Sequence, residues 1–215
     1  MEKLDLTIPL STVTLQGDLI LPKNPRGIVI FSHGSGSSRF SPRNRMVAEL
    51  IQKQNIGTLL FDLLTSEEDD LYENRFNIDL LSDRLIETTQ WVLDHKSTTG
   101  LAIGYFGAST GAASALRAAA YFKTKIKAVV SRGGRPDLAI SVLPQVTAPT
   151  LLLVGGLDVP VIGMNKMAFD ALASVKEIKI IPGATHLFEE PGTLLEVAEA
   201  AIAWYKRYLT TKDAE

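Results

Sequence analysis

The sequence predicts an α/β fold, in which helices cover both faces of a mostly parallel central sheet. From residue 27 onward, short apolar runs alternate with longer stretches whose apolar residues recur at helical spacing, which is typical of strands joined by crossover helices. The 215 residues contain no repeat and no linker-like stretch, so we expect a single domain over residues 1–215. A hydrophobic share of 46% is enough to build one core.

The start of the chain follows a different pattern. Residues 3–22 hold two runs in which apolar and polar residues alternate, and this predicts an antiparallel pair of half-buried strands at one sheet edge. Further strands are expected at 27–33, 58–62, 101–106, 126–131, 150–154 and 177–181, and helices at 42–54, 78–95, 109–121, 161–174 and 193–209.

Local signals set some of these boundaries. Ser41 before Pro42 predicts an N-cap followed by proline at the first helical position. The spacing Thr193-x-x-Glu196 predicts a capping box at the start of the last helix. The acidic run at 67–70 predicts a solvated loop, because short charge runs usually face water.

The composition excludes several classes of function. A net charge of −2 provides no basic face for a nucleic acid or an anionic membrane. The absence of cysteine excludes disulfides, thiolate metal sites and a cysteine nucleophile. The three histidines lie on separate predicted elements, and no dinucleotide fingerprint is present. We therefore expect no metal and no cofactor.

The sequence also predicts a location and a kind of partner. The N-terminus has no basic stretch followed by an apolar one, as a secretory signal would, and no apolar run is long enough to span a bilayer. A chain without cysteine also fits a reducing cytosol. We expect a cytoplasmic protein that acts on a small molecule, and the sequence leaves the oligomeric state open.

The sequence Gly107-Ala-Ser109-Thr-Gly111 has the pattern of a nucleophile elbow. It follows a predicted strand and opens a predicted helix, and the glycines permit a sharp turn between them. The alternative is a tight turn with a capping serine. The stretch between the strands at 126–131 and 150–154 is too short to hold an inserted lid domain. We therefore expect Ser109 to be a nucleophile in a site open to solvent.

A serine nucleophile needs a base to take its proton. His186 follows the last predicted strand, on the same sheet edge as Ser109, and is our candidate. His33 begins a glycine-rich turn, and His95 lies at a helix end beside charged residues. A structural role is the alternative for any of the three.

An acid is needed to orient the base. Asp158 follows a strand and a Gly-Gly turn at the same sheet edge, and we expect it to contact His186. Its alternative role is a helix N-cap. Asp62 and Asp137 are the reserve candidates, since each follows another strand end. The chain order serine, aspartate, histidine is the one found in α/β-hydrolases.

The turn His33-Gly34-Ser35-Gly36 supplies candidate oxyanion donors. We expect the backbone N–H of Ser35, with Gly36 as its near neighbour, to act with the N–H of Thr110 on the oxygen of a tetrahedral intermediate. A phosphate cradle is the alternative, but the turn lacks the Gly-Lys-Ser/Thr ending of a P-loop.

Arginines follow two of these strand ends. Arg132 and Arg135 come after the strand at 126–131, and a second group follows the glycine-rich turn: Arg39, Arg43 and Arg45. If two or more point inward, the substrate carries a carboxylate or a phosphate, which guanidinium groups match; ordinary surface positions are the alternative. An apolar wall is expected from Phe40, Leu63, Leu187 and Phe188, for which core packing is the alternative.

Taken together, the glycine-rich turn, the elbow, Asp158 and His186 resemble the α/β-hydrolase superfamily over nearly the whole chain. Within it, the chain is similar to small bacterial hydrolases grouped with dienelactone hydrolases. The resemblance implies an α/β-hydrolase fold and a serine hydrolase that cleaves an ester-like bond. Dienelactone hydrolases carry cysteine at the elbow, where this chain has Ser109. The resemblance therefore does not imply the dienelactone reaction. Segments 61–65 and 131–137 also resemble a subgroup sometimes fused to phosphoribosyltransferase domains, which implies no substrate.

Two other functions remain open at this point. A protein with a hydrolase fold can bind a ligand without catalysis; losing one of the three triad residues would favour that, and all three are present. The same triad can also transfer an acyl group to an acceptor other than water.

Overall fold

The computed structural model describes residues 2–209. The strands are β1 (Glu2–Pro9), β2 (Thr14–Leu21), β3 (Ile28–Ser32), β4 (Gly57–Phe61), β5 (Ile103–Ala108), β6 (Ile126–Arg132), β7 (Thr150–Gly155) and β8 (Lys176–Ile181). The helices are α1 (Pro42–Gln52), α2 (Ser66–Asp69), α3 (Ile78–Asp94), α4 (Thr110–Phe122), α5 (Val159–Ala171) and α6 (Thr193–Tyr208). Short 3₁₀ segments lie at η1 (Tyr72–Phe76), η2 (Lys123–Lys125) and η3 (Pro136–Gln145).

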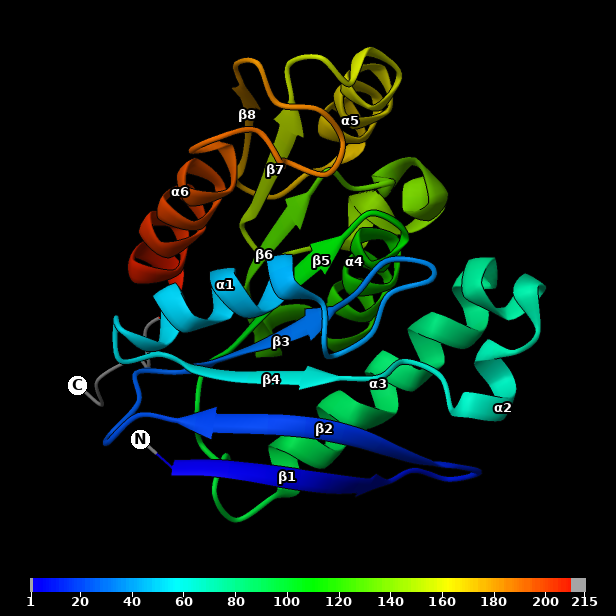
Figure 1. Ribbon diagram of the computed structural model, residues 1–215, viewed down its shortest axis with the longest axis vertical. Helices are drawn as coiled ribbons and strands as arrows, with labels where there is room; N and C mark the ends of the chain where they lie inside the picture. Colours follow the sequence, from blue (N-terminus) through cyan, green and yellow to red (C-terminus); the bar gives the residue numbers. More distant parts are fainter. Residues whose placement is uncertain (1, 210–215) are drawn as a thin grey trace.

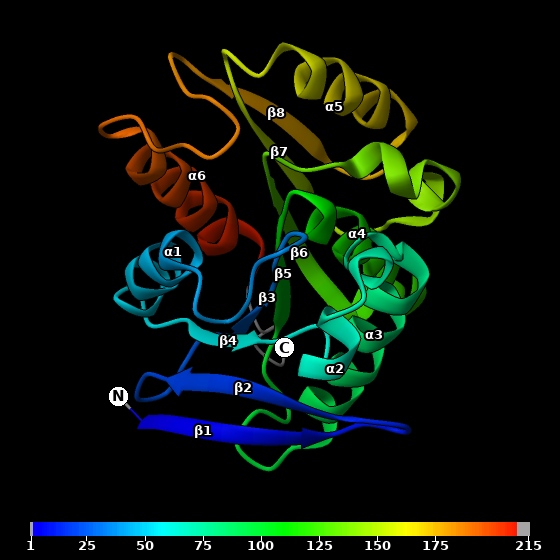
Figure 2. The same ribbon diagram turned by 45° about the vertical axis from the view of Figure 1, so that its right-hand side comes forward.

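The strands form one eight-stranded sheet in the order β1-β2-β4-β3-β5-β6-β7-β8 (Figure 1). The strands from β4 to β8 in this order run parallel, whereas β2 pairs antiparallel with both β1 and β4. Figure 2 shows β1 and β2 at one end of the sheet and β8 at the other. The predicted α/β fold with an antiparallel N-terminal pair is confirmed, and only η3 lies between β6 and β7, where a lid would need to be inserted.

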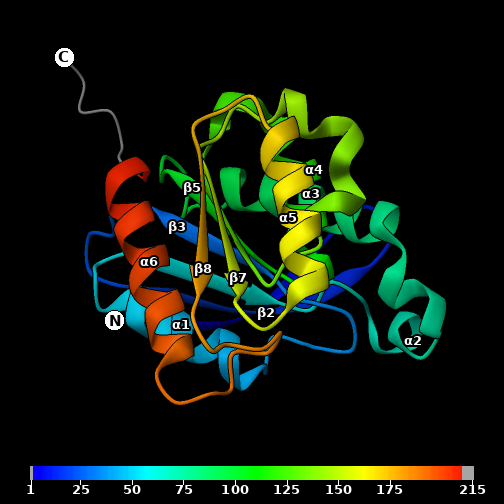
Figure 3. The same ribbon diagram turned by 90° about the horizontal axis from the view of Figure 1, so that it is seen from above.

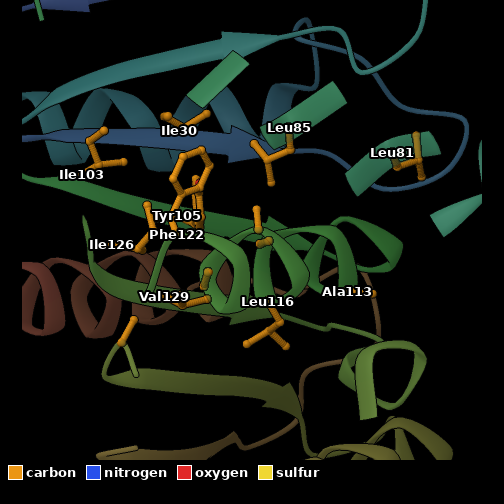
Figure 4. Close-up of a cluster of buried hydrophobic side chains, with 14 of the residues drawn as sticks. Ile30, Leu81, Leu85, Ile103, Tyr105, Ala113, Leu116, Phe122, Ile126 and Val129 are labelled. Carbon is orange, nitrogen blue, oxygen red and sulfur yellow. The ribbon is translucent and has the colours of Figure 1, made fainter. Parts of the chain in front are cut away.

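Helices cover both faces of the sheet. Helices α1 and α6 lie on one face, and α3, α4 and α5 lie on the other (Figure 3). A hydrophobic cluster fills each interface. Figure 4 shows part of the cluster under α3 and α4, where Leu85 lies toward Tyr105 of β5 and Leu116 lies toward Val129 of β6.

The central strand β5 is fixed from both faces. The Tyr105 hydroxyl is 2.8 Å from Oγ1 of Thr89 in α3. On the opposite face, the hydroxyl of Tyr205 in α6 donates to the Tyr105 carbonyl oxygen at 2.7 Å. Both tyrosines are fully buried, and buried polar groups with partners favour one arrangement of the core. The strand that leads into Ser109 is therefore held rigidly.

The predicted solvated loop at 67–70 is wrong in part. Residues 66–69 form α2, and Thr65 and Glu68 make a reciprocal capping box at its start. Oε1 of Glu68 accepts a hydrogen bond of 2.6 Å from the guanidinium of Arg84 in α3, whose side chain is only 8% exposed. The run therefore docks a short helix onto α3, because the buried arginine needs a carboxylate partner.

The predicted capping box of α6 is wrong as well. The chain enters α6 through Gly192 at φ 83°, and no side chain caps this end. The Thr193 hydroxyl instead donates to the Glu190 carbonyl at 2.8 Å, and Glu196 pairs with Lys179 of β8 at 3.0 Å. The sequence spacing is right for a capping box, but the left-handed entry turns the threonine away.

The order of the strands creates a crevice at one edge of the sheet. Strand β3 lies between β4 and β5. Helix α1 follows β3 on one face of the sheet, and α4 follows β5 on the other face (Figure 3). The loops after β3 and β5 therefore diverge, and such a switch point is where α/β sheets bind ligands. No helix between residues 2 and 209 is both long and apolar enough to cross a membrane.

We expect Glu68→Ala to lower the free energy of unfolding by about 2 kcal/mol, because it removes a cap and the partner of a largely buried arginine. The matched control is Asp70→Ala, since Asp70 is an exposed member of the same acidic run and such substitutions usually change stability by less than about 0.5 kcal/mol. Urea denaturation measures both, and equal losses would contradict the docking role of Glu68.

Candidate active site

Ser109 lies on a strained turn between β5 and α4, with φ 51° and ψ −123°. Glycines make this turn possible. A Cβ atom on Gly107 would lie 2.5 Å from Cα of Ala112, and one on Gly111 would overlap the carbonyl oxygen of Ser32. Only glycine fits at both positions, so the two glycines of the predicted elbow are required by close packing of backbone.

Backbone hydrogen bonds hold Ser109 in this conformation. Its N–H donates to the carbonyl oxygen of Arg132 in β6 at 3.2 Å, and its own carbonyl accepts from the N–H groups of Ala112 and Arg135 at 3.1 and 3.0 Å. A residue in this region of φ and ψ costs of order 1–3 kcal/mol and persists only when its surroundings fix it.

The structure brings the three predicted triad residues together. Nε2 of His186 lies 3.4 Å from Oγ of Ser109, and Nδ1 of His186 lies 2.7 Å from Oδ2 of Asp158. Contacts between a nucleophile and its base tighten when a substrate binds. The arrangement allows Asp158 to hold the imidazole while Nε2 faces the serine. The catalytic role of the three residues stays a prediction.

The loops that carry Asp158 and His186 are bonded to each other. The N–H groups of Gly156 and Leu157 donate to the carbonyls of Ile181 and Ala184 at 2.8 and 2.9 Å. A Cβ atom on Gly155 would lie 2.5 Å from the Ala184 carbonyl. Asp158 precedes α5, but its side chain makes no capping bond. The Asp158 carboxylate bonds His186 and does not cap the helix.

The other two histidines have different partners. His33 is buried, its Nδ1 lies 2.9 Å from the Gly34 carbonyl and its Nε2 accepts the Leu63 N–H at 3.0 Å. Nδ1 therefore carries the proton, and burial lowers the pKa of His33. His95 stacks on Trp91 with ring centroids 4.3 Å apart. His33 has a structural role at the glycine-rich turn.

Both reserve acids are engaged by arginines. Asp62 accepts the backbone N–H of Arg39 at 2.8 Å and also pairs with its guanidinium. Asp137 binds Arg135 through both carboxylate oxygens, with contacts of 2.8–3.2 Å. These hydrogen bonds raise the pKa of Arg135. Among the three candidate acids, Asp158 is the one hydrogen-bonded to His186.

Two of the three predicted oxyanion residues contact each other. The backbone N–H of Ser35 donates to Oγ1 of Thr110 at 2.9 Å. Gly36 has φ 65° and faces a different hollow, beside Leu63 and Leu81. Sequence analysis missed the Thr110 side chain, because only its backbone N–H was considered.

A pocket of about 260 Å³ opens beside Ser109 and His186. Its volume is near the lower end of about 300–1,000 Å³ that is usual for ligand sites. Of the four residues predicted to contact substrate, Arg132 and Leu187 line it, whereas Arg135 is turned to Asp137 and Phe40 lies under the guanidinium groups of Arg39 and Arg45.

Arg132 is almost completely buried in this pocket, with 5% of its surface exposed. Its Nη2 donates to Oδ1 of Asn44 in α1 at 3.0 Å, and its Nε has no partner among residues 2–209. Burial, and then the charge of nearby Arg43, lower the pKa of Arg132 to about 10, so the group is still cationic at neutral pH. Arg43 and Asn44 also line the pocket. Asn44 was missed by sequence analysis, because nothing in its helix marks it as polar lining.

Leu63 and Phe188, the other expected wall residues, are core residues with 0% and 1% exposure. Phe188 has φ 56°, and its N–H donates to the Thr185 carbonyl at 3.3 Å. Its ring lies 5.9 Å from the guanidinium carbon of Arg132. Phe188 therefore anchors the loop that carries His186 instead of lining the pocket.

This sheet, with a serine on a strained strand-to-helix turn at its switch point, defines an α/β-hydrolase. The chain belongs to the dienelactone hydrolase family, whose profile matches residues 15–211.

Curated relatives from two Mycobacterium tuberculosis strains, provisionally named phosphoribosyl transferases, are 53% identical over 197 residues, which are 92% of this chain and 44% of each relative. The chain thus spans less than half the length of these relatives. A crystal structure of dienelactone hydrolase from Anabaena variabilis is 51% identical, with a TM-score of 0.94 and coverage of 97% of this chain and 98% of that chain. The esterase domain of a Rhodothermus marinus protein, 18% identical, shares the fold, with a TM-score of 0.78 and coverage of 97% and 100%.

The strain at Ser109 predicts that Ser109→Gly is more stable than Ser109→Ala by about 1 kcal/mol. Glycine adopts this φ without steric cost, and this relief exceeds the extra entropy that glycine loses on folding. Urea denaturation of the two variants compares proteins that both lack the hydroxyl. Equal midpoints, or a less stable glycine variant, would show that the turn stores no strain.

Proposed function

We propose that this chain is a serine hydrolase that cleaves a carboxylic ester of a small substrate through an acyl-enzyme. The observation that carries the proposal is the continuous contact from Ser109 Oγ through the imidazole of His186 to the carboxylate of Asp158. Membership of the dienelactone hydrolase family supports hydrolysis as the class of reaction.

In the first step, Ser109 Oγ attacks the ester carbonyl and forms a carbon–oxygen bond. His186 takes the hydroxyl proton at Nε2, while Asp158 holds the Nδ1–H and stabilises the imidazolium. When the tetrahedral intermediate collapses, the ester bond breaks and His186 gives its proton to the leaving alcohol. Water then attacks the acyl-serine by the same route, with His186 again as base, and releases the acid.

The backbone N–H groups of Ser35 and Thr110 are the oxyanion donors in this proposal. In the structure, the Ser35 N–H donates to the Thr110 hydroxyl. Threonine in a helix has two accessible side-chain rotamers, so its hydroxyl can turn away when the substrate oxygen arrives. Each such donor is typically worth a factor of about 10²–10³ in rate.

The pocket limits the substrate to a small molecule with a polar or charged part. Its volume is about 260 Å³, and its lining contains two arginines, Arg43 and Arg132, beside the apolar Leu187. An ester that carries an anionic group fits this lining, since guanidinium groups match carboxylates and phosphates.

A fluorophosphonate probe should label the protein at Ser109, and Ser109→Ala should abolish labelling. Ser35→Ala keeps the backbone N–H and is the matched control, which should retain labelling. Mass spectrometry of the labelled peptide locates the modified residue. A wild-type protein that is folded but not labelled would overturn the enzyme proposal in favour of a binding protein.

Asp158→Asn should lower kcat for a p-nitrophenyl ester by roughly a thousandfold or more, because the amide holds the wrong imidazole tautomer. Asp137→Asn is the matched control, since Asp137 follows another strand end but binds Arg135, and kcat should change less than about twofold. Steady-state kinetics of both variants would reject Asp158 as the orienting acid if the two losses were similar.

A further inference from the structure

Two arginines from different elements line the pocket beside Ser109. Arg132 ends β6, whose last residue pairs with Ala108 of β5, and Arg43 lies in the first turn of α1. Both side chains line the pocket with Ser109 and His186. Arg132 is linked to the serine through its backbone, because its carbonyl accepts the Ser109 N–H. A ligand group held by Arg132 is therefore close to the reacting serine.

Among residues 2–209, Arg132 makes no salt bridge, and the nearby charge that acts on it is that of Arg43. Its one side-chain hydrogen bond is to the neutral amide of Asn44, and its Nε has no partner. Arg84, another buried arginine whose Nε also has no partner among residues 2–209, differs in contacting the carboxylates of Glu68 and Glu87. A buried charge without a partner destabilises a fold, so the arrangement indicates a site whose counter-charge arrives with a ligand.

Arg43 is also incompletely partnered. Its Nη1 bonds Oε1 of Glu189 at 2.7 Å, but the glutamate side chain is 63% exposed, and exposed ion pairs contribute little. Its Nε is buried without a partner. The N-cap of α1, Ser41, also lines the pocket, so the positive end of the helix dipole points to the same space.

We propose that this pocket binds a phosphate group of the substrate, held between the guanidinium groups of Arg132 and Arg43, so that the ester cleaved at Ser109 belongs to a small phosphorylated molecule. This inference rests on the proposed function. Two cations and a helix N-terminus match a group with two negative charges and three acceptor oxygens better than a carboxylate, which has one charge. Because the ion pair between Arg43 and Glu189 is exposed and weak, Arg43 can exchange it for a contact with the phosphate.

The test measures binding of inorganic phosphate to Ser109→Ala by calorimetry, with thermal unfolding as a second readout. This variant lacks the proposed nucleophile, so binding is measured independently of hydrolysis. We expect phosphate to bind and to raise Tm, and Arg132→Gln or Arg43→Gln in the same background to weaken binding at least about tenfold. Arg135→Gln is the matched control, because Arg135 is held by Asp137, and it should change affinity less than about twofold.

Each outcome decides the proposal. Absence of phosphate binding to a folded Ser109→Ala protein, or equal losses in the Arg132 and Arg135 variants, would overturn it. Acetate or succinate binding more tightly than phosphate would also overturn it, in favour of a carboxylate site. Arg43→Gln keeps the test usable if Arg132→Gln does not fold, since Arg43 is less buried.

Failure of the proposed function has a separate signature. If labelling of Ser109 by the fluorophosphonate fails while phosphate still binds through Arg132, the anion site stands and the hydrolase proposal falls. If labelling succeeds and phosphate neither binds nor slows labelling of the wild type, the hydrolase stands and the phosphate site falls.

Discussion

The N-terminal end of α4 lies against the end of β3 with no room for a side chain between them. A Cβ atom on Gly111 would overlap the Ser32 carbonyl, and one on Gly107 would lie 2.5 Å from Cα of Ala112. The chain must therefore turn from strand to helix within one residue, and Ser109 takes the positive φ that this turn requires. The geometry of the rest of the site follows from this constraint, because it fixes where the hydroxyl stands at the sheet edge.

The surrounding structure supplies the free energy that holds the strained residue. Strand β5 is fixed by buried tyrosine hydrogen bonds on both faces, and the Ser109 backbone is bonded to β6 and to the loop after it. The histidine and aspartate are located by a second close approach, in which the loops after β7 and β8 share two backbone hydrogen bonds. The two close approaches bring three side chains from distant parts of the sequence within hydrogen-bond distance.

Sequence reasoning predicted the parts of the site that depend on backbone. Ser109, Asp158 and His186 each follow a strand, and the carboxyl ends of parallel strands meet at one edge. Sequence reasoning predicted side-chain directions less accurately where those directions depend on tertiary partners. Arg135 and Phe40 also lie in loops that follow strand ends, but Asp137 binds the guanidinium of Arg135, and two arginines stack on the exposed ring of Phe40. The acidic run was misjudged for the same reason, because its partner Arg84 lies sixteen residues away on another helix.

The neutral and the charged hydrogen-bond donors of the pocket differ in how far their bonds are already made. The Ser35 N–H, a neutral donor, is bonded to the Thr110 hydroxyl. The guanidinium of Arg132 has only one neutral partner and an unbonded Nε. In the proposed reaction, a substrate oxygen would replace an existing bond at the Ser35 N–H, with little net gain in the ground state, whereas an anion at Arg132 would form bonds that were absent. Under that proposal, ground-state affinity resides mainly at the arginines, and the Ser35 N–H acts where negative charge develops in the transition state, which is the division that favours catalysis over simple binding.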